Sequence, residues 1–170
     1  HNGREESTTM TLIPQVCKAT TLPLIAAGGI ASGQAMVAAM ALGAEGVQIG
    51  TAFALTKESS ASEAFKLACI SANEGDTMLC LKKIAPSRLL RNQLFYRIAE
   101  AEANGASADE LRALLGEKAT KRGIFEGDIE NGEIEIGQIA SSISSIDSVA
   151  DCMSRIMREY QETIDRINML

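Results

Sequence analysis

The fold class is decided by the stretch Thr21-Leu-Pro-Leu-Ile-Ala-Ala-Gly-Gly29, a short apolar run that ends in two glycines. Its apolar residues do not alternate with polar ones, which is typical of a strand buried on both faces in a parallel sheet. Ser32 then offers an N-cap for a helix over residues 33–42, which Gly43 ends. We therefore expect a strand, a glycine turn and a helix, in that order.

The same pattern begins again directly downstream. Residues 44–49 predict a second short strand, and Gly50-Thr51 forms a second glycine turn. A helix over residues 9–20, with apolar residues three or four positions apart, precedes the first strand. Helices that alternate with buried strands predict an α/β fold with a parallel sheet.

The remainder of the chain predicts mostly helices. We expect helices over residues 61–73, 93–104 and 108–115, an extended segment at 77–82, and loops around the glycines from Gly123 to Gly137. The chain should therefore divide into residues 1–57 with the strands, a small, mostly helical domain over residues 58–145, and a closing segment over residues 146–170 that packs back on the first part.

The closing segment predicts one long helix, from about Asp147 to Asn168. Ser148 and Asp151 have the spacing of a capping box at its start. Apolar residues along it are spaced by three or four positions, so we expect one buried stripe. The stripe consists of Val149, Met153, Ile156, Tyr160, Ile164 and Ile167.

Composition narrows the class of protein. The formal net charge of −6 argues against a nucleic-acid partner, because phosphate binding requires a basic surface. No apolar run approaches the roughly 18–20 residues that span a bilayer, so we expect no membrane segment. The four cysteines form no C-x-x-C pair and only one histidine accompanies them, so we expect no metal site, and we expect reduced, buried thiols in a cytoplasmic protein.

Two clusters of charge need a separate interpretation. The acidic run could bind a metal ion, but it lacks the spacing of a calcium loop, and a solvated surface is favoured. The basic cluster could bind an anion, but solvated side chains or intramolecular ion pairs are favoured. The acidic residues are Glu126, Asp128, Glu130, Glu133 and Glu135, and the basic residues are Lys82, Lys83, Arg88 and Arg91.

The two glycine turns together predict a phosphate site. Gly28-Gly29 and Gly50-Thr51 each follow a buried strand. Glycine lets the backbone approach a ligand with its N–H groups turned inward, and the N-terminus of the helix that follows the first turn favours an anion. In β/α barrels the loops after the last two strands commonly bind phosphate. The alternative is that these glycines only form tight turns.

Two longer stretches resemble a known family. Leu24-Ile-Ala-Ala-Gly-Gly-Ile30 and Ala41-Leu-Gly-Ala-Glu-Gly-Val-Gln-Ile-Gly-Thr51 are similar to the nitronate monooxygenase (2-nitropropane dioxygenase) family, which includes enoyl-acyl-carrier-protein reductase II. His1-Asn-Gly3, with Thr8-Thr-Met10 after it, resembles the loop that follows barrel strand six. Further matches are Lys57-Glu-Ser59, Arg88, Arg91-Asn92, Glu126-Gly-Asp-Ile129 and Gly137-Gln138.

This resemblance implies a fold and a cofactor. The fold is the C-terminal part of a TIM (β/α)8 barrel, its last two βα units, with strands at residues 22–26 and 46–49 and a small helical domain appended. The cofactor is FMN. The resemblance assigns the binding of its phosphate to Gly28, Gly29, Gly50 and Thr51. Gln48, at the end of the second strand, is expected to contact the cofactor as well.

One position departs from the family pattern. The family commonly carries Arg after the Gly-Thr pair, where this chain has Ala52. If that Arg supports the phosphate or the flavin in relatives, FMN binds more weakly here or another cation replaces it.

His1 is the only imidazole in the chain, and the resemblance gives it a catalytic role. Nitroalkane oxidation begins with removal of the proton next to the nitro group, and imidazole suits this step because it titrates near neutral pH. In the reductase branch NAD(P)H would reduce FMN, and His1 would polarise or protonate the product. His1 therefore does not separate the two activities.

Three functions follow as hypotheses. The first is an FMN-dependent monooxygenase that oxidises nitronates or nitroalkanes with O2, and the second is enoyl-acyl-carrier-protein reductase II acting on an enoyl thioester. The third is an inactive fragment that retains FMN or phosphate binding. The chain opens without Met and supplies two strands where a barrel needs eight, so an N-terminal portion should supply strands one to six. The oligomeric state stays open, a homodimer included.

Overall fold

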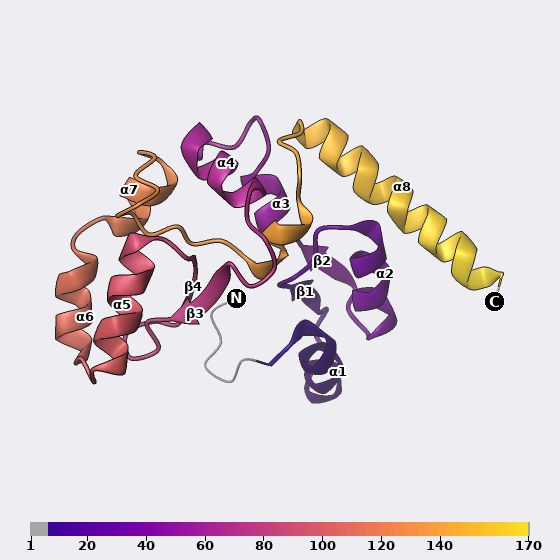
Figure 1. Cartoon of the computed structure of the whole chain (residues 1–170). Coiled ribbons are helices and arrows are strands. Elements are labelled where there is room, and N and C mark those ends of the chain that lie inside the picture. The colour runs from indigo at the N-terminus through magenta and orange to yellow at the C-terminus, as the bar shows by residue number, and fades with distance from the viewer. Residues whose placement is uncertain (1–6, 170) are drawn as a thin grey trace. The chain divides into compact units, whose positions relative to one another are not determined.

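The protein is described by a computed structural model that covers residues 7–169 (Figure 1). The chain forms two compact units. Residues 7–58 and 147–169 make up one, called here the parallel-strand unit, and residues 59–146 make up the other, called here the insert unit. Among the described residues, no helix combines the length and the apolar character that a membrane span needs.

The parallel-strand unit contains the predicted βα repeat. β1 pairs with β2 in parallel, and Ala26 lies opposite Val47. Ser32 caps α2 as predicted, because its hydroxyl accepts a hydrogen bond from the N–H of Ala35. The α/β class and the parallel pairing are thus confirmed. The elements are α1 (Thr9–Ala19), β1 (Ile25–Ala27), α2 (Gly33–Ala41), β2 (Gly46–Gln48), α3 (Thr51–Ala54) and α8 (Val149–Asn168).

Only one face of the parallel pair is covered. Ala26 of β1 is buried with Ile13 and Ala39, on the side that the helices cover. Ile25, the neighbouring residue on the strand, is 55% exposed. The prediction of a strand buried on both faces is therefore wrong for the described residues, because successive side chains point to opposite faces and only alternate ones reach the helices.

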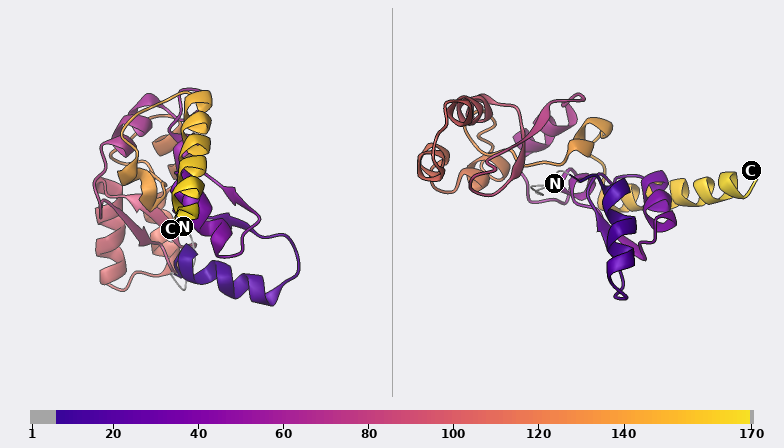
Figure 2. Two further views of the ribbon diagram at one scale, coloured as in Figure 1. Left: turned by 90° about the vertical axis from the view of Figure 1, so that its right-hand side faces the viewer. Right: turned by 90° about the horizontal axis from the view of Figure 1, so that it is seen from below.

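Helix α8 lies alongside α2 in both views of Figure 2. At its start the Ser148 hydroxyl accepts a hydrogen bond from the Asp151 N–H, so the cap at Ser148 is confirmed. The Asp151 carboxylate accepts from the Ser148 hydroxyl, so of the predicted capping box only the Ser148 half is confirmed. The predicted stripe is only partly correct. Ile156 is buried, whereas Val149, Met153 and Ile167 are exposed. The buried face is rotated toward Cys152 and Thr163, because α8 meets α2 along that face.

The insert unit contains the predicted helices and an antiparallel hairpin. α4, α5 and α6 confirm three expected helices, and the capping box at the start of α6 joins Ser107 to Glu110. Leu89, Leu94, Ile98 and Leu111 form its core. The elements are α4 (Glu63–Ile70), β3 (Thr77–Cys80), β4 (Ser87–Leu90), α5 (Gln93–Ala103), α6 (Ala108–Leu115), α7 (Ala119–Ile124) and the 3-10 helix η1 (Gln138–Ser142).

Three elements of the insert unit were not expected from the sequence: β4, α7 and η1. β4 pairs with β3 in antiparallel register, with Thr77 opposite Leu90. Its four residues are too few to show a clear alternation. α7 occupies a stretch where we expected loops, and Gly123 lies inside it. Glycine disfavours helices, but here it allows the helix to lie directly on the backbone of Glu133.

The charged clusters differ in part from expectation. Glu133 is only 7% exposed and accepts a hydrogen bond from the Thr120 hydroxyl, so the prediction of a solvated acidic surface is wrong at this residue. A buried carboxylate needs such a partner. In the basic cluster, Arg91 forms an ion pair with Asp76, and Arg88 donates to the Thr77 carbonyl. An intramolecular ion pair is therefore confirmed for Arg91, whereas Arg88 forms a hydrogen bond to the backbone instead.

The cysteines carry free thiols. Burial raises the pKa of the Cys69 thiol to about 12. Burial also raises the pKa of Cys80 to about 12, and the nearby charges of Glu102 and Glu133 add to the shift. Both thiols are therefore neutral and unreactive at physiological pH.

Candidate functional site

The two glycine turns leave the sheet at the same end. β1 and β2 run in parallel, and Ala27 at the end of β1 lies opposite Gln48 at the end of β2. The turn at Gly28-Gly29 and the turn at Gly50-Thr51 therefore both follow the carboxyl ends of neighbouring strands. In open and closed α/β sheets this is the end at which ligands bind.

Glycine is required by the backbone of the first turn. Gly28 and Gly29 have φ angles of +100° and +72°, in the left-handed region that residues with a side chain rarely adopt. The hydroxyl of Thr9 donates a hydrogen bond of 2.7 Å to the Gly28 carbonyl and so ties the turn to α1. A Cβ added to Gly29 would meet no atom within 4 Å. Gly29 therefore faces open space.

Gly50 has a different reason to be glycine. Its φ and ψ of −97° and −68° are accessible to any residue. A Cβ added here would also meet no atom within 4 Å. Neither backbone conformation nor crowding thus excludes a side chain at Gly50. Glycine at this position leaves the backbone at the start of α3 without a side chain.

In the chain, Gln48 precedes the second turn and Ala52 follows it. Gln48 is exposed at the end of β2, so its amide is available to a ligand at this end of the sheet. Ala52 is 4% exposed within α3. Its methyl group is packed and supplies no positive charge to this turn.

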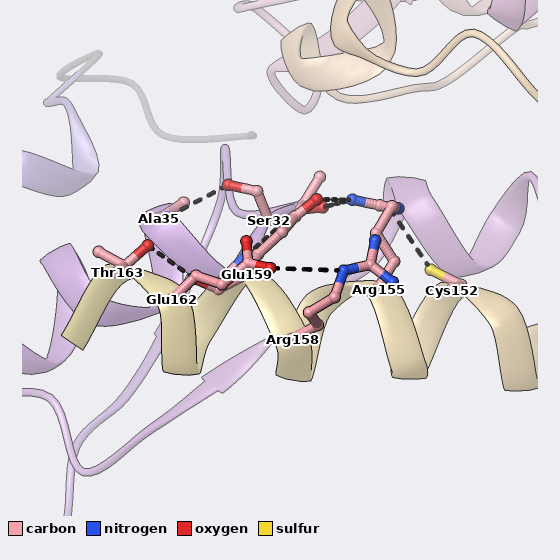
Figure 3. A network of polar contacts seen from close by, with 10 residues as sticks. Ser32, Ala35, Cys152, Arg155, Arg158, Glu159, Glu162 and Thr163 are labelled. Atoms are coloured by element: carbon pink, nitrogen blue, oxygen red, sulfur yellow. Dashed lines mark hydrogen bonds and ion pairs between the residues drawn. The ribbon is translucent and has the colours of Figure 1, made fainter. Parts of the chain in front are cut away.

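The N-terminus of α2 already holds an anion. The carboxylate of Glu159 on α8 accepts a hydrogen bond of 2.9 Å from the N–H of Gly33 (Figure 3). Ser32 accepts from the N–H of Ala35 at 3.2 Å. The expectation that this helix end receives the anion of a ligand is therefore wrong for the N–H groups of Gly33 and Ala35. Side chains of the protein already accept both hydrogen bonds.

The predicted site residues thus fall into two sets. Gly28, Gly29, Gln48 and the Gly50-Thr51 turn come together at one end of the parallel pair. His1, the predicted catalytic residue, lies outside the described residues. Glu159 and Arg155 adjoin the first turn from α8 and were missed, because no local pattern links them to a segment more than 120 residues away.

Comparison with known proteins decides the family. The sequence model of nitronate monooxygenase matches residues 1–159. The chain belongs to the nitronate monooxygenase family. The resemblance noted in the sequence is thereby confirmed. A probable nitronate monooxygenase from Staphylococcus saprophyticus is 42% identical over 93 residues, which are 54% of this chain and 26% of that protein.

Solved structures of two relatives match nearly the whole chain. FabK from Thermotoga maritima is 36% identical, with a TM-score of 0.87 over 96% of this chain and 52% of that chain. Nitroalkane oxidase from Streptomyces ansochromogenes is 26% identical, with a TM-score of 0.77 over 98% of this chain and 48% of that chain. The chain therefore spans about half the length of these two nitronate monooxygenase relatives.

Proposed function

We propose that this chain is the FMN-phosphate-binding part of a nitronate monooxygenase-type oxidoreductase. The observation that carries the proposal is the pair of glycine turns at the carboxyl ends of β1 and β2, where Gly29 and Gly50 face open space. Membership of the family supports oxidoreductase chemistry. A turn without side chains at this end of a parallel sheet suits a phosphate group.

The proposed architecture is the last two βα units of a (β/α)8 barrel. β1 and β2 would be strands seven and eight, within residues 1–57, and residues 58–145 and 146–170 would form the appended domain and the closing helix. Six strands would come from a preceding segment. Three observations support this: the exposed face that carries Ile25, the exposed apolar residues of α8, and the span of half a relative's length.

Each proposed site residue has a role in binding or proton transfer. The backbone N–H groups of Gly28, Gly29 and Gly50, with the Thr51 hydroxyl, would hold the phosphate, and Gln48 would contact the rest of the cofactor. Bound FMN supplies the electron-accepting chemistry of the oxidation. His1 would take the proton next to the nitro group, because imidazole is neutral and basic near pH 7.

A second activity has specific support. The chain is more similar to FabK than to the nitroalkane oxidase, both in identity and in TM-score. This favours enoyl-acyl-carrier-protein reductase II as the alternative, with NAD(P)H as reductant and an enoyl thioester on acyl carrier protein as substrate. The proposed phosphate site serves both activities equally.

The choice of reductant and oxidant separates the candidates. A nitronate monooxygenase is expected to consume O2 when a nitronate is added, without NAD(P)H. A reductase is expected to oxidise NAD(P)H under anaerobic conditions when an enoyl thioester is added. Oxygen-electrode and absorbance assays on the purified protein measure both. Protein that takes up added FMN but shows neither activity would contradict both activities and favour the inactive fragment that retains FMN binding. Protein that takes up no FMN would contradict the proposed FMN site.

Gly50→Ala tests the phosphate site directly. We expect the dissociation constant for FMN to rise about tenfold, which is about 1.4 kcal/mol, because the methyl group enters the space proposed for the phosphate. The melting temperature should not change, since the backbone angles of Gly50 suit alanine and no atom lies within 4 Å. FMN titration followed by flavin fluorescence measures the first quantity and thermal unfolding the second.

Gly75→Ala is the matched control. Gly75 also has open space around it, but its φ is +85°. This variant should therefore lose stability and keep its affinity for FMN. If Gly50→Ala binds FMN as tightly as the parent protein, the second turn does not hold the phosphate.

A further inference from the structure

Two side chains of α8 hold the segment that follows the first glycine turn. Arg155 Nη1 donates to the carbonyl of Ala31 at 3.4 Å, and Glu159 Oε2 accepts from the N–H of Gly33 at 2.9 Å. The two side chains also join each other, with Arg155 Nη1 3.1 Å from Glu159 Oε1 (Figure 3). The two members of this ion pair thus form hydrogen bonds to the backbone of residues 31 and 33, which flank Ser32 in the chain.

The pair is sheltered from solvent. The side chains of Arg155 and Glu159 are 33% and 19% exposed. Burial alone would lower the pKa of Arg155, but its hydrogen bond to Glu159 and the negative charge of Glu159 outweigh that effect and raise it. The guanidinium therefore stays charged, and removal of either partner leaves a partly buried charge without its counterpart.

The glycine turn between β1 and α2 is thus anchored at both ends. Thr9 binds the carbonyl of Gly28 on one side, and Arg155 with Glu159 binds residues 31 and 33 on the other. Glycines adopt many backbone conformations when they are free. Anchoring them in one conformation before the ligand arrives reduces the entropy lost on binding.

We infer that Arg155 and Glu159 are positioning residues for the phosphate group of the cofactor. They do not contact the ligand themselves, and they act by holding the Gly28-Gly29 turn in its binding conformation. Glu159 has a second effect. Because its carboxylate accepts the hydrogen bond of the Gly33 N–H, that N–H is not available to the phosphate, which would bind at the glycine turns instead. The inference rests on the proposed function.

The experiment compares FMN with riboflavin, which lacks the phosphate. In Arg155→Met and Glu159→Gln proteins we expect the dissociation constant for FMN to rise about tenfold, with that for riboflavin unchanged. We also expect faster amide hydrogen exchange over residues 28–33 in the absence of ligand. Glu159→Gln retains an acceptor for the Gly33 N–H, so it keeps the test valid if the Arg155 variant unfolds.

The chain offers a matched control pair on the same helix. Arg158 and Glu162 have the same spacing as Arg155 and Glu159 and lie 3.8 Å apart, but their side chains are well exposed. Arg158→Met and Glu162→Gln should change neither the FMN affinity nor the exchange rates.

Each remaining outcome has one meaning. Equal weakening of FMN and riboflavin in the Arg155 and Glu159 variants, or unchanged FMN affinity and exchange, would overturn the inference and leave the phosphate site intact. A parent protein that binds FMN no better than riboflavin would overturn the proposed phosphate site, and the inference with it.

Discussion

Gly33→Ala is expected to destabilise the parallel-strand unit by about 3 kcal/mol or more, at the upper end of what overpacking costs. A Cβ at this position would lie 2.0 Å from the backbone nitrogen of Tyr160 and 2.5 Å from the carbonyl oxygen of Ile156. These are backbone atoms of α8, so no side chain can rotate away, and the two helices must separate. The separation would also break the hydrogen bond from Gly33 to Glu159.

Thermal unfolding measures this effect. A loss of about 3 kcal/mol corresponds to a fall in melting temperature of roughly 6–12 °C for a protein of this size. Gly50→Ala is the control, because it adds the same methyl group in the same unit without any atom within 4 Å. Equal melting temperatures for the two variants would mean that α2 and α8 do not pack as closely as described.

Gly123→Ala is expected to have an effect of similar size in the insert unit. An added Cβ would lie 2.3 Å from the carbonyl oxygen of Glu133. Gly132 also lies close to Gly123, since a Cβ on Gly132 would lie 2.3 Å from the Gly123 Cα. The methyl group must therefore push α7 away from Glu133 and disturb its buried hydrogen bond to Thr120. We expect a loss of about 3 kcal/mol in denaturant unfolding.

Gly105→Ala separates crowding from backbone strain. Gly105 has a φ of +83° and open space around it, so alanine there should cost only about 1–2 kcal/mol through the left-handed conformation. If Gly123→Ala is no more destabilising than Gly105→Ala, the close contact between α7 and Glu133 is not important for stability.

Features that depend on neighbours in sequence were predicted well. The caps at Ser32 and Ser148 were identified correctly because each hydroxyl accepts from an N–H only three residues away. The two strands and their glycine turns were identified for the same reason. A short apolar run followed by glycine indicates a strand that ends in a turn, which depends only on neighbouring residues.

Features that depend on distant partners were missed. β4 is defined by its pairing with β3 and by a bridge between Leu89 and Glu135, rather than by its own four residues. α7 contains Gly123, which weakens any local prediction of a helix, and the backbone of Glu133 explains why glycine is there. The buried face of α8 was misjudged because its apolar residues do not reveal which side meets α2.

The candidate site divides in the same way. The sequence by itself determined the α/β class, the order of the βα elements and the two glycine turns, because turns and caps depend on residues a few positions apart. Only the tertiary structure decided that one face of the parallel pair is exposed at Ile25 and that Glu159, 126 residues along the chain, accepts from the N–H of Gly33. Such contacts depend on packing between distant segments, which no local pattern encodes.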